Sequence, residues 1–173
     1  MRIPYPEMWV SADGEKRRPR HPGGMRILLA LGAGGLDLER AVAAIAALGE
    51  EHEVVVVHGQ PAPVAHQLEL ALRNRLPERD VVSVLSQVVL AGEGLEPTAI
   101  AEIRSLRALV AAGALVVCAA GARTAVTVTR DGSLELVDAA LDEDRVAELL
   151  ARRLDADLVP AGSWIEAAVT LAE

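Results

Sequence analysis

The feature that most constrains the fold of this chain is a regular alternation of short apolar runs with amphipathic segments, which begins at Met25. The runs "RILLAL", "EVVVV" and "ALVVCAA" are apolar at nearly every position, as in strands that are buried on both faces of a sheet. The segments between them carry apolar residues every three or four positions, as amphipathic helices do. This alternation predicts an α/β fold, a three-layer α/β/α sandwich around a mostly parallel sheet.

Helix-capping residues and glycines divide this region into its expected elements. Asp37 is expected to cap the first helix, which Gly49 ends, and Pro97 to stand near the start of a later helix, which Gly113 ends. The run "DVVSVLSQVVL" is interpreted as one strand. The expected inward-facing helix rows are Leu38, Val42, Ile45 and Leu48; Val64, Leu68, Leu72 and Leu76; Ile103, Leu106 and Val110; and Val146, Leu149, Leu150 and Leu154.

The last third of the chain predicts a hairpin, two helices and a short strand. The run "AVTVTRDGSLELV" alternates on both sides of Asp131-Gly132, which is typical of a two-residue hairpin turn. Asp142 is expected to cap a helix, "ADLV" to form the last strand, and Ser163 with Glu166 to cap a final helix.

Composition limits the classes of protein to which the chain can belong. Its 173 residues are 51% hydrophobic and 24% charged, which suits a single globular domain. A net charge of -8 argues against nucleic acid or an anionic membrane as a partner. The apolar runs are too short for a membrane span, and no apolar targeting segment is visible. Cys118 is the only cysteine, so no internal disulfide forms; we expect it to pack in the core of a cytoplasmic protein.

Residues 1–24 differ in composition from the rest of the chain. They are rich in Pro, Gly and Arg and show no sustained period, so we interpret them as a flexible N-terminal arm before a domain that spans residues 25–173. The basic run from Lys16 to Arg20 is interpreted as solvated rather than docked.

Several segments together resemble carbamate kinase, of the amino-acid kinase family, and they occur in that family's order. The most telling is "ALRNRLPERDVVSVLSQVVL", and the others are "MRILLALGAGGL", "HEVVVVHGQ", "IRSLRALVAAGALVVCAAGA", "VDAALDEDRVAELLARRLDADLV" and "AGSWIEAAV". The resemblance implies the amino-acid-kinase fold, phosphotransferase ancestry and a homodimer built across one edge and helix layer of the sheet.

Compared with members of the carbamate kinase family, the chain lacks two long segments. Family members carry a protruding substrate subdomain after the "QVV" strand, whereas here "AGEGLEPT" is expected to connect Leu90 directly to the next helix. The family's "LTDVDGVY" region and later nucleotide-site elements are missing after "DADLV", where Pro160 joins "AGSWIEAAV". The resemblance therefore implies the loss of the lid and of the wall around adenine and ribose.

The loops that correspond to the family's phosphate loops are altered. Gly32, Ala33, Gly34 and Gly35 replace a family sequence "GGNA" at the end of the first strand. In the second loop His58 and Gly59 are kept, Gln60 replaces an asparagine and Pro61 replaces a glycine, which removes a backbone N–H. A third loop has Gly121, Ala122 and Arg123 where the family has a run of glycines, which puts a bulky cation where a nucleotide phosphate would approach. These loops are expected to hold a triphosphate poorly.

Lysines are the second loss that the resemblance implies. The family's catalytic lysines lie in "IDKD" and "GSMGPK"; here Glu143 takes the lysine position of the first, and the second lysine is deleted after Ser163. Lys16 is the only lysine in the chain. Phosphoryl transfer depends on positioning and on stabilisation of a polyanionic transition state. Losing one preorganised donor costs on the order of 10² to 10³ in rate, so we expect little kinase activity.

The remaining candidate sites are weaker. The candidate residues for binding a small anion or other ligand are Gly32, Ala33, Gly34, Gly35, His58, Gly59, Gln60, Gly121 and Arg123. For Gly32 to Gly35 a tight strand-to-helix turn is favoured over an anion site. His58 and His66 are candidates for a metal pair with Asp37 or Asp142, but turn and surface histidines are favoured, so no metal is expected. Ser83, Ser86 and Cys118 are candidate nucleophiles, for which packing in buried strands is favoured.

Two functions from different classes follow. The first is a carbamate-kinase-like, non-catalytic binding or assembly module that uses no cofactor and forms a homodimer. The second is an ATP-independent enzyme for a small carbamoyl or carboxylate substrate, with Arg123 as anion clamp and His58 as acid or base. For Arg123, however, a salt bridge to Asp142 or Asp144 is favoured over binding a ligand. A residual carbamate or amino-acid kinase is the third and weakest reading.

Overall fold

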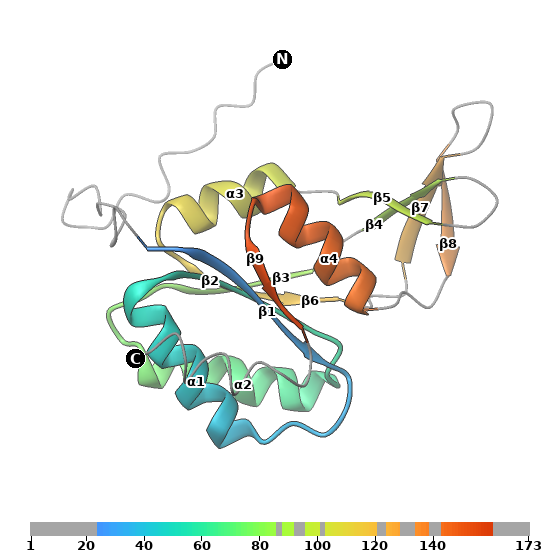
Figure 1. Ribbon diagram of the computed structural model, residues 1–173. Helices are drawn as coiled ribbons and strands as arrows, with labels where there is room; N and C mark the ends of the chain where they lie inside the picture. Colours follow the sequence, from blue (N-terminus) through green and yellow to red (C-terminus); the bar gives the residue numbers. More distant parts are fainter. Residues whose placement is uncertain are drawn as a thin grey trace, which may run out of the picture.

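The computed structural model of the chain describes residues 24–85, 88–91, 96–100, 103–120, 124–128, 134–138 and 143–160. Within this part a five-stranded parallel sheet forms the centre of the molecule (Figure 1). Its strands, in spatial order, are β3 (Val81–Leu85), β6 (Leu115–Ala119), β2 (Glu53–His58), β1 (Arg26–Gly32) and β9 (Asp157–Val159). The expected α/β class with a mostly parallel sheet is confirmed.

Helices cover both faces of this sheet, which gives the three expected layers (Figure 1). One face carries α1 (Leu38–Glu51) and α2 (Ala62–Arg75), and the other carries α3 (Ile103–Ala111) and α4 (Glu143–Leu154). Strand β2 shows why both faces are apolar: Val54 and Val56 pack toward α1 and α2, whereas Val55 and Val57 pack toward α3 and α4. All four valines are buried, as the run "EVVVV" predicts.

A second sheet lies beside the central one (Figure 1). Among the described residues it contains β5 (Glu96–Ile100), β4 (Val88–Ala91), β7 (Thr124–Val128) and β8 (Leu134–Asp138), in that order. Strands β7 and β8 are antiparallel, so the expected hairpin is confirmed as a pair of strands. Val128 pairs with Leu134, and the proposed turn at Asp131-Gly132 lies outside the described residues.

Two expectations for the region from 80 to 103 are wrong. The run "DVVSVLSQVVL" is not one strand, because β3 belongs to the central sheet and β4 to the second; a continuous apolar run does not show where the chain changes sheets. Pro97 does not begin a helix but lies in β5, which pairs with β4 before α3 starts at Ile103. Strand β5 is an outer strand, and its register with β4 shifts beside Leu90, the partner of Pro97. An outer strand with a bulge is where a strand tolerates proline.

The helix ends explain several single residues. Asp37 caps α1 as expected, its side chain accepting the N–H of Arg40 at 3.2 Å. Gly113, after α3, has a φ of 85°, which suits its expected role as a helix stop. Gly49 does not end α1, which continues to Glu51. Gly49 is instead buried inside the helix, where an added Cβ would lie 2.9 Å from Nη1 of Arg79.

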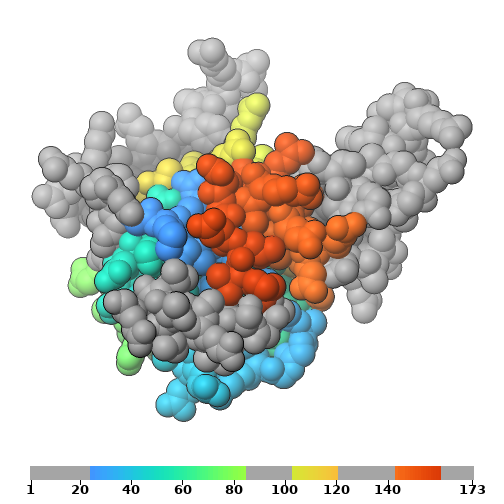
Figure 2. All heavy atoms as spheres, viewed as in Figure 1, coloured from blue at the N-terminus to red at the C-terminus, as the bar shows by residue number. Residues whose placement is uncertain are grey.

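Two arginines hold the carboxyl end of α4. Nη1 of Arg26, in β1, donates to the carbonyl of Leu154 at 2.7 Å, and Nε of Arg107, in α3, donates to the carbonyl of Arg153 at 2.9 Å. Cations at this end of a helix complement its dipole. The space-filling view shows the start of β1 and the end of α4 side by side at the surface (Figure 2). Among the described residues, no helix combines the length and apolar character needed to cross a bilayer.

Candidate functional site

The candidate site lies at the carboxyl ends of β1, β2 and β6. Gly32 is paired with His58, and His58 with Ala119, so these strands end at the same level. The N–H of Gly59 donates to the carbonyl of Gly32 at 3.0 Å, and the N–H of Ala120 donates to the carbonyl of His58 at 2.8 Å. In parallel α/β sheets, ligands bind at this edge. We call residues 32–37 the glycine loop and residues 58–63 the proline loop.

The glycine loop combines one required glycine with an open surface. Gly32 has a φ of 70°, a conformation that residues with a Cβ rarely adopt. Nothing lies within 4 Å of a Cβ added at Gly34 or Gly35, so both face open space. Gly32 is therefore needed for the turn, whereas Gly34 and Gly35 leave the surface of the loop free of side chains.

The side chain of Gln60 joins the two loops. Its Nε2 donates to the carbonyl of Gly32 at 2.9 Å and to the carbonyl of Gly34 at 2.9 Å. Since a side-chain amide nitrogen carries two hydrogens, these bonds use both donors. The backbone N–H of Gln60 is also used, because it donates to Nδ1 of His58 at 3.2 Å. Sequence reasoning included Gln60 among the anion-binding candidates but did not anticipate this bridge.

The proline loop supplies few further donors. Pro61 stands at the N-cap of α2 and Pro63 lies in its first turn, and neither has a backbone N–H. Of the four positions whose N–H groups point out of a helix start, only Ala62 and Val64 carry one. The start of α2 is therefore a weak anion site compared with an ordinary helix start.

His58 is buried, with only 2% of its surface exposed. The expectation that it is a turn or surface histidine is wrong. His58 is the last residue of β2 and follows Val54 and Val56 on the face toward α1 and α2, because alternate residues of a strand share a face. Burial lowers the pKa of His58 from 6.5, and the nearby carboxylate of Glu69 acts in the opposite direction. Its ring is neutral at neutral pH and, with Nδ1 accepting from Gln60, carries its hydrogen on Nε2.

Glu143 reaches the proline loop from the other face of the sheet. It is the first residue of α4, and its carboxylate is the group nearest to the position that a Cβ atom would take at Gly59. A methyl group at Gly59 would overlap this carboxylate. The only residue that fits beneath Glu143 without displacing it is glycine, so an acidic side chain covers the start of the loop.

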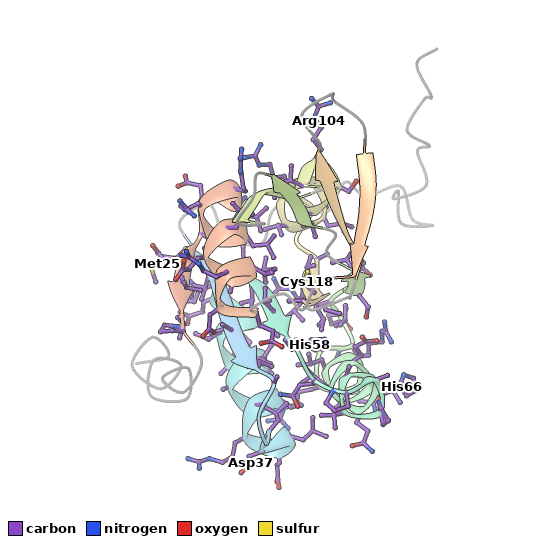
Figure 3. The ribbon with its side chains drawn as sticks, turned by 90° about the vertical axis from the view of Figure 1, so that its right-hand side faces the viewer. Met25, Asp37, His58, His66, Arg104 and Cys118 are labelled. Atoms are coloured by element: carbon purple, nitrogen blue, oxygen red, sulfur yellow. The ribbon has the colours of Figure 1, made fainter. Side chains whose placement is uncertain are left out.

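The other candidate residues do not gather at this edge. His66 points away from the molecule on α2, separate from His58 (Figure 3). Cys118 is buried in β6, as expected, whereas Ser83 is exposed on β3. The expectation of a buried Ser83 is wrong because β3 is an outer strand of the sheet. No three His, Cys, Asp or Glu side chains of the described residues could together hold a metal ion. Gly121, Ser86, Arg123, Asp142 and Ser163 lie outside the described residues.

A hollow of about 550 Å³ lies elsewhere, between α4 and β9. Its lining includes Glu148, Arg152, Asp155 and Leu158. Asp155 connects the end of α4 to the start of β9, at the opposite edge of the sheet from the two loops. It contributes no residue to the candidate site.

Sequence reasoning missed the role of Arg79, which belongs to the segment "LPERD". Arg79 is buried and donates to the carbonyls of Gly113 at 3.0 Å, His52 at 3.2 Å and Gly49. It thus connects the ends of α1 and α3 at the edge of the sheet away from the loops. Its signal in the sequence is the arginine itself, placed two residues before the apolar start of β3.

The comparison with known proteins identifies the fold. No protein-family model matches the chain. The structure is similar to that of Giardia carbamate kinase, with a TM-score of 0.60 and 17% identity over 79% of this chain and 71% of that one. Carbamate kinase from Giardia lamblia bound to AMP-PNP gives a TM-score of 0.58 and 18% identity, over 79% of this chain and 70% of that one. A protein from Aeropyrum pernix K1 gives a TM-score of 0.60 and 19% identity, over 78% of this chain and 73% of that one. The expected resemblance is therefore confirmed at the level of the fold.

Proposed function

We propose that this chain, which has the fold of carbamate kinases, is a non-catalytic binding or assembly module that no longer holds ATP. The observation that carries the proposal is the Gln60 bridge. Both amide hydrogens of Gln60 and its backbone N–H are bonded within the loops, to Gly32, Gly34 and His58. Backbone and amide donors that are already paired inside the protein can bind a phosphate only if those bonds break.

Charge supports the same proposal. Glu143 lies against Gly59, so a phosphate that approached this loop would meet a carboxylate. At short range, two like charges repel by about 1 kcal/mol in water and by several times that in a partly buried site. Lys16 is the one lysine of the chain, so none of the residues that the structure describes is a lysine. Any positive charge that offsets the carboxylate of Glu143 would therefore have to come from an arginine.

The ligand that we propose for the remaining surface is a small anion or carboxylate. Gly34 and Gly35 leave the glycine loop open, and Gly121 and Arg123 follow within three residues of Ala120 at the end of β6. We propose Arg123 as the cation that a single negative charge would meet at this edge. The glycine loop as a whole, Gly32 to Gly35, and His58 to Gln60 would form the walls of that site.

The test is thermal unfolding with Mg-ATP, ADP, carbamoyl phosphate, acetate and sulfate in separate samples. A ligand at about 100 times its dissociation constant adds roughly 2.7 kcal/mol, which raises the unfolding midpoint of a chain of this size by roughly 5 to 10 °C. We expect no shift with either nucleotide. A shift of this size with Mg-ATP would refute the proposal, and one with acetate or sulfate alone would support a small-anion site.

Assembly is the other half of the proposal. We propose a homodimer formed through β3 and α2, because β3 is an outer strand of the central sheet and α2 exposes 45% of Leu70. The mass in solution tests this directly: twice the chain mass is expected, and a monomer at all concentrations would contradict it. Leu70→Asp should lower the mass to that of the monomer, whereas Gln67→Asp, on the same helix, should weaken the dimer less.

We also propose a cytoplasmic location and a two-part chain, with an arm of residues 1–24 and a domain of residues 25–173. The buried thiol of Cys118 suits a reducing compartment. Removal of residues 1–24 should leave the unfolding midpoint unchanged. A large fall in that midpoint would show that the arm is part of the domain.

A further inference from the structure

The ring of His58 holds one end of the hydrogen-bond network that joins the two loops. Its Nδ1 accepts the backbone N–H of Gln60, whose side chain holds Gly32 and Gly34. A ring nitrogen can accept a hydrogen bond only while it carries no proton. The protonation state of one buried ring therefore decides whether the backbone of Gln60 is held.

We infer that His58 is a proton-operated latch, in which the neutral ring keeps the proline loop closed on the glycine loop and protonation at Nδ1 releases Gln60. This inference rests on the proposed function, because the loops it closes are those that the proposal describes as closed to phosphate. On protonation the N–H of Gln60 loses its acceptor and faces another N–H. The closed arrangement is then no longer favoured on electrostatic grounds.

The charged groups around His58 set the direction of this switch. On the same face, Glu69 of α2 attracts an imidazolium, and its carboxylate is itself 3.9 Å from Nη1 of Arg73. Glu143 reaches Gly59, the next residue, from the α4 side, and Asp37 is occupied as the cap of α1.

The neighbouring strands meet His58 through Gly32 and Ala119, neither of which titrates. Burial lowers the pKa of His58 and Glu69 offsets part of that effect, so release is expected in mildly acidic solution, below the ordinary value of 6.5.

Release changes what the edge can bind. The N–H of Gln60 becomes available, and a positive charge stands beside the loop. Both changes favour a small oxyanion over the closed state. Sulfate is the suitable probe, because it keeps its double charge throughout the range in which histidine titrates.

The experiment measures hydrogen exchange of the Gln60 backbone and side-chain amides by NMR, without ligand, at about pH 7.5 and about pH 5. After correction for the intrinsic pH dependence of exchange, we expect the amides of Gln60 to exchange roughly five to ten times faster relative to a core amide at the lower pH. The amide of Val117 in β6 serves as the core reference, which reports any global loss of stability. The ring resonances of His58 in the unaltered protein should titrate together with the Gln60 amides.

The matched variants are His58→Asn and His66→Asn. The Oδ1 atom of an asparagine accepts the Gln60 N–H at any pH, so H58N should keep protection at both pH values, while H66N should behave like the unaltered protein. In sulfate titrations, tighter binding at the lower pH is expected in the unaltered protein and in H66N but not in H58N.

Two outcomes would overturn the latch: Gln60 protection that does not change with pH while His58 titrates, or the same pH-dependent loss in H58N. Neither outcome concerns nucleotide binding. Failure of the latch is thus distinct from failure of the proposed function, which the Mg-ATP measurement decides.

Discussion

The amide of Gln60 donates to the carbonyl of Gly34 across 2.9 Å, although 26 positions separate the two residues in the chain. The same nitrogen donates to Gly32 at an equal distance. One side chain thus connects the turn after β1 to the turn after β2. The loops at this edge are joined to each other through groups that would otherwise face a ligand.

Removal of this bridge should destabilise the protein. We expect Gln60→Ala to lower the free energy of unfolding by about 1 to 2 kcal/mol, because it removes one partly buried and one exposed hydrogen bond. Gln60→Glu should cost more at neutral pH, because a carboxylate would face two carbonyl oxygens, and the loss should diminish in acid as that carboxyl is protonated. Urea unfolding measures both, with Gln67→Ala on the exposed side of α2 as control. Equal stability of Q60A and the unaltered protein would contradict the bridge.

The charge of Glu143 should determine how strongly the loops repel anions. Its carboxylate lies against Gly59, so we expect Glu143→Gln to raise the affinity for sulfate. Glu143→Lys should raise it further, by roughly tenfold or more over the unaltered protein, because it replaces a repulsive charge by an attractive one. Isothermal titration at low salt measures the affinity. Glu148→Lys changes the net charge equally, on the exposed side of the same helix, and should have a smaller effect. An equal effect of the two lysine variants would show that net charge alone is responsible.

The pKa of His58 links stability to pH. Because burial lowers the pKa of the folded state below 6.5, the unfolded chain binds a proton more readily in mild acid. The contribution of neutral His58 is therefore complete above about pH 6.5 and is lost as the pH falls from there toward the lowered pKa. In His58→Asn the unfolding free energy should depend less on pH in this window, and in H66N it should not differ from the unaltered protein. An unchanged pH dependence in H58N would exclude this assignment.

Arg79 should be the costliest charged residue to remove at the opposite edge. It is buried and donates to three carbonyls from the ends of α1 and α3, so Arg79→Ala should lower the unfolding free energy by about 3 kcal/mol. Arg79→Lys should recover only part of this loss, because an ammonium cannot reproduce the planar array of donors. Arg75→Ala, at the exposed end of α2, is the control and should cost little. A negligible effect of R79A on thermal unfolding would refute the structural role.

Two glycines of one loop should respond in opposite ways to alanine. Gly32→Ala is expected to destabilise by about 1 kcal/mol, because its φ is positive. Gly35→Ala meets no atom and should be neutral or stabilising by up to about 1 kcal/mol. Differential scanning calorimetry compares the midpoints, and equal shifts would contradict the assignment of Gly32 as the required glycine.

Sequence patterns predicted the layers of this fold well and its changes of direction poorly. The valines of β2 and, in the helix rows, Ile45, Leu72 and Leu150 are buried as periodicity predicts, because burial on one or both faces determines which residues are apolar. The ends of two rows are only half-buried, at Leu38, Val42, Val64 and Leu76. The exchange of sheets between Leu85 and Val88, and Pro97 in an outer strand, leave no such pattern. Both depend on which strands become neighbours, and that is decided by contacts distant in sequence.

The position of the two candidate loops was predictable, but the contacts between them were not. Because Gly32 to Gly35 and His58 to Gln60 follow neighbouring parallel strands, both loops lie at the same edge of the sheet. Gln60 bonds to Gly34, which is 26 positions away in the chain, and Glu143 covers Gly59, which is 84 positions away. Both contacts depend on how far a side chain extends between distant segments. No periodicity records such reach.

Helix α4 is held by hydrogen bonds at one of its ends and is in close contact at the other. Arg26 and Arg107 donate to its last two carbonyls, and the side chain of Glu143, its first residue, lies against Gly59. A helix of 12 residues is about 18 Å long. The two arginines connect the last turn of α4 to β1 and α3, so a ligand that displaced the side chain of Glu143 would act at the end of α4 that these hydrogen bonds do not hold.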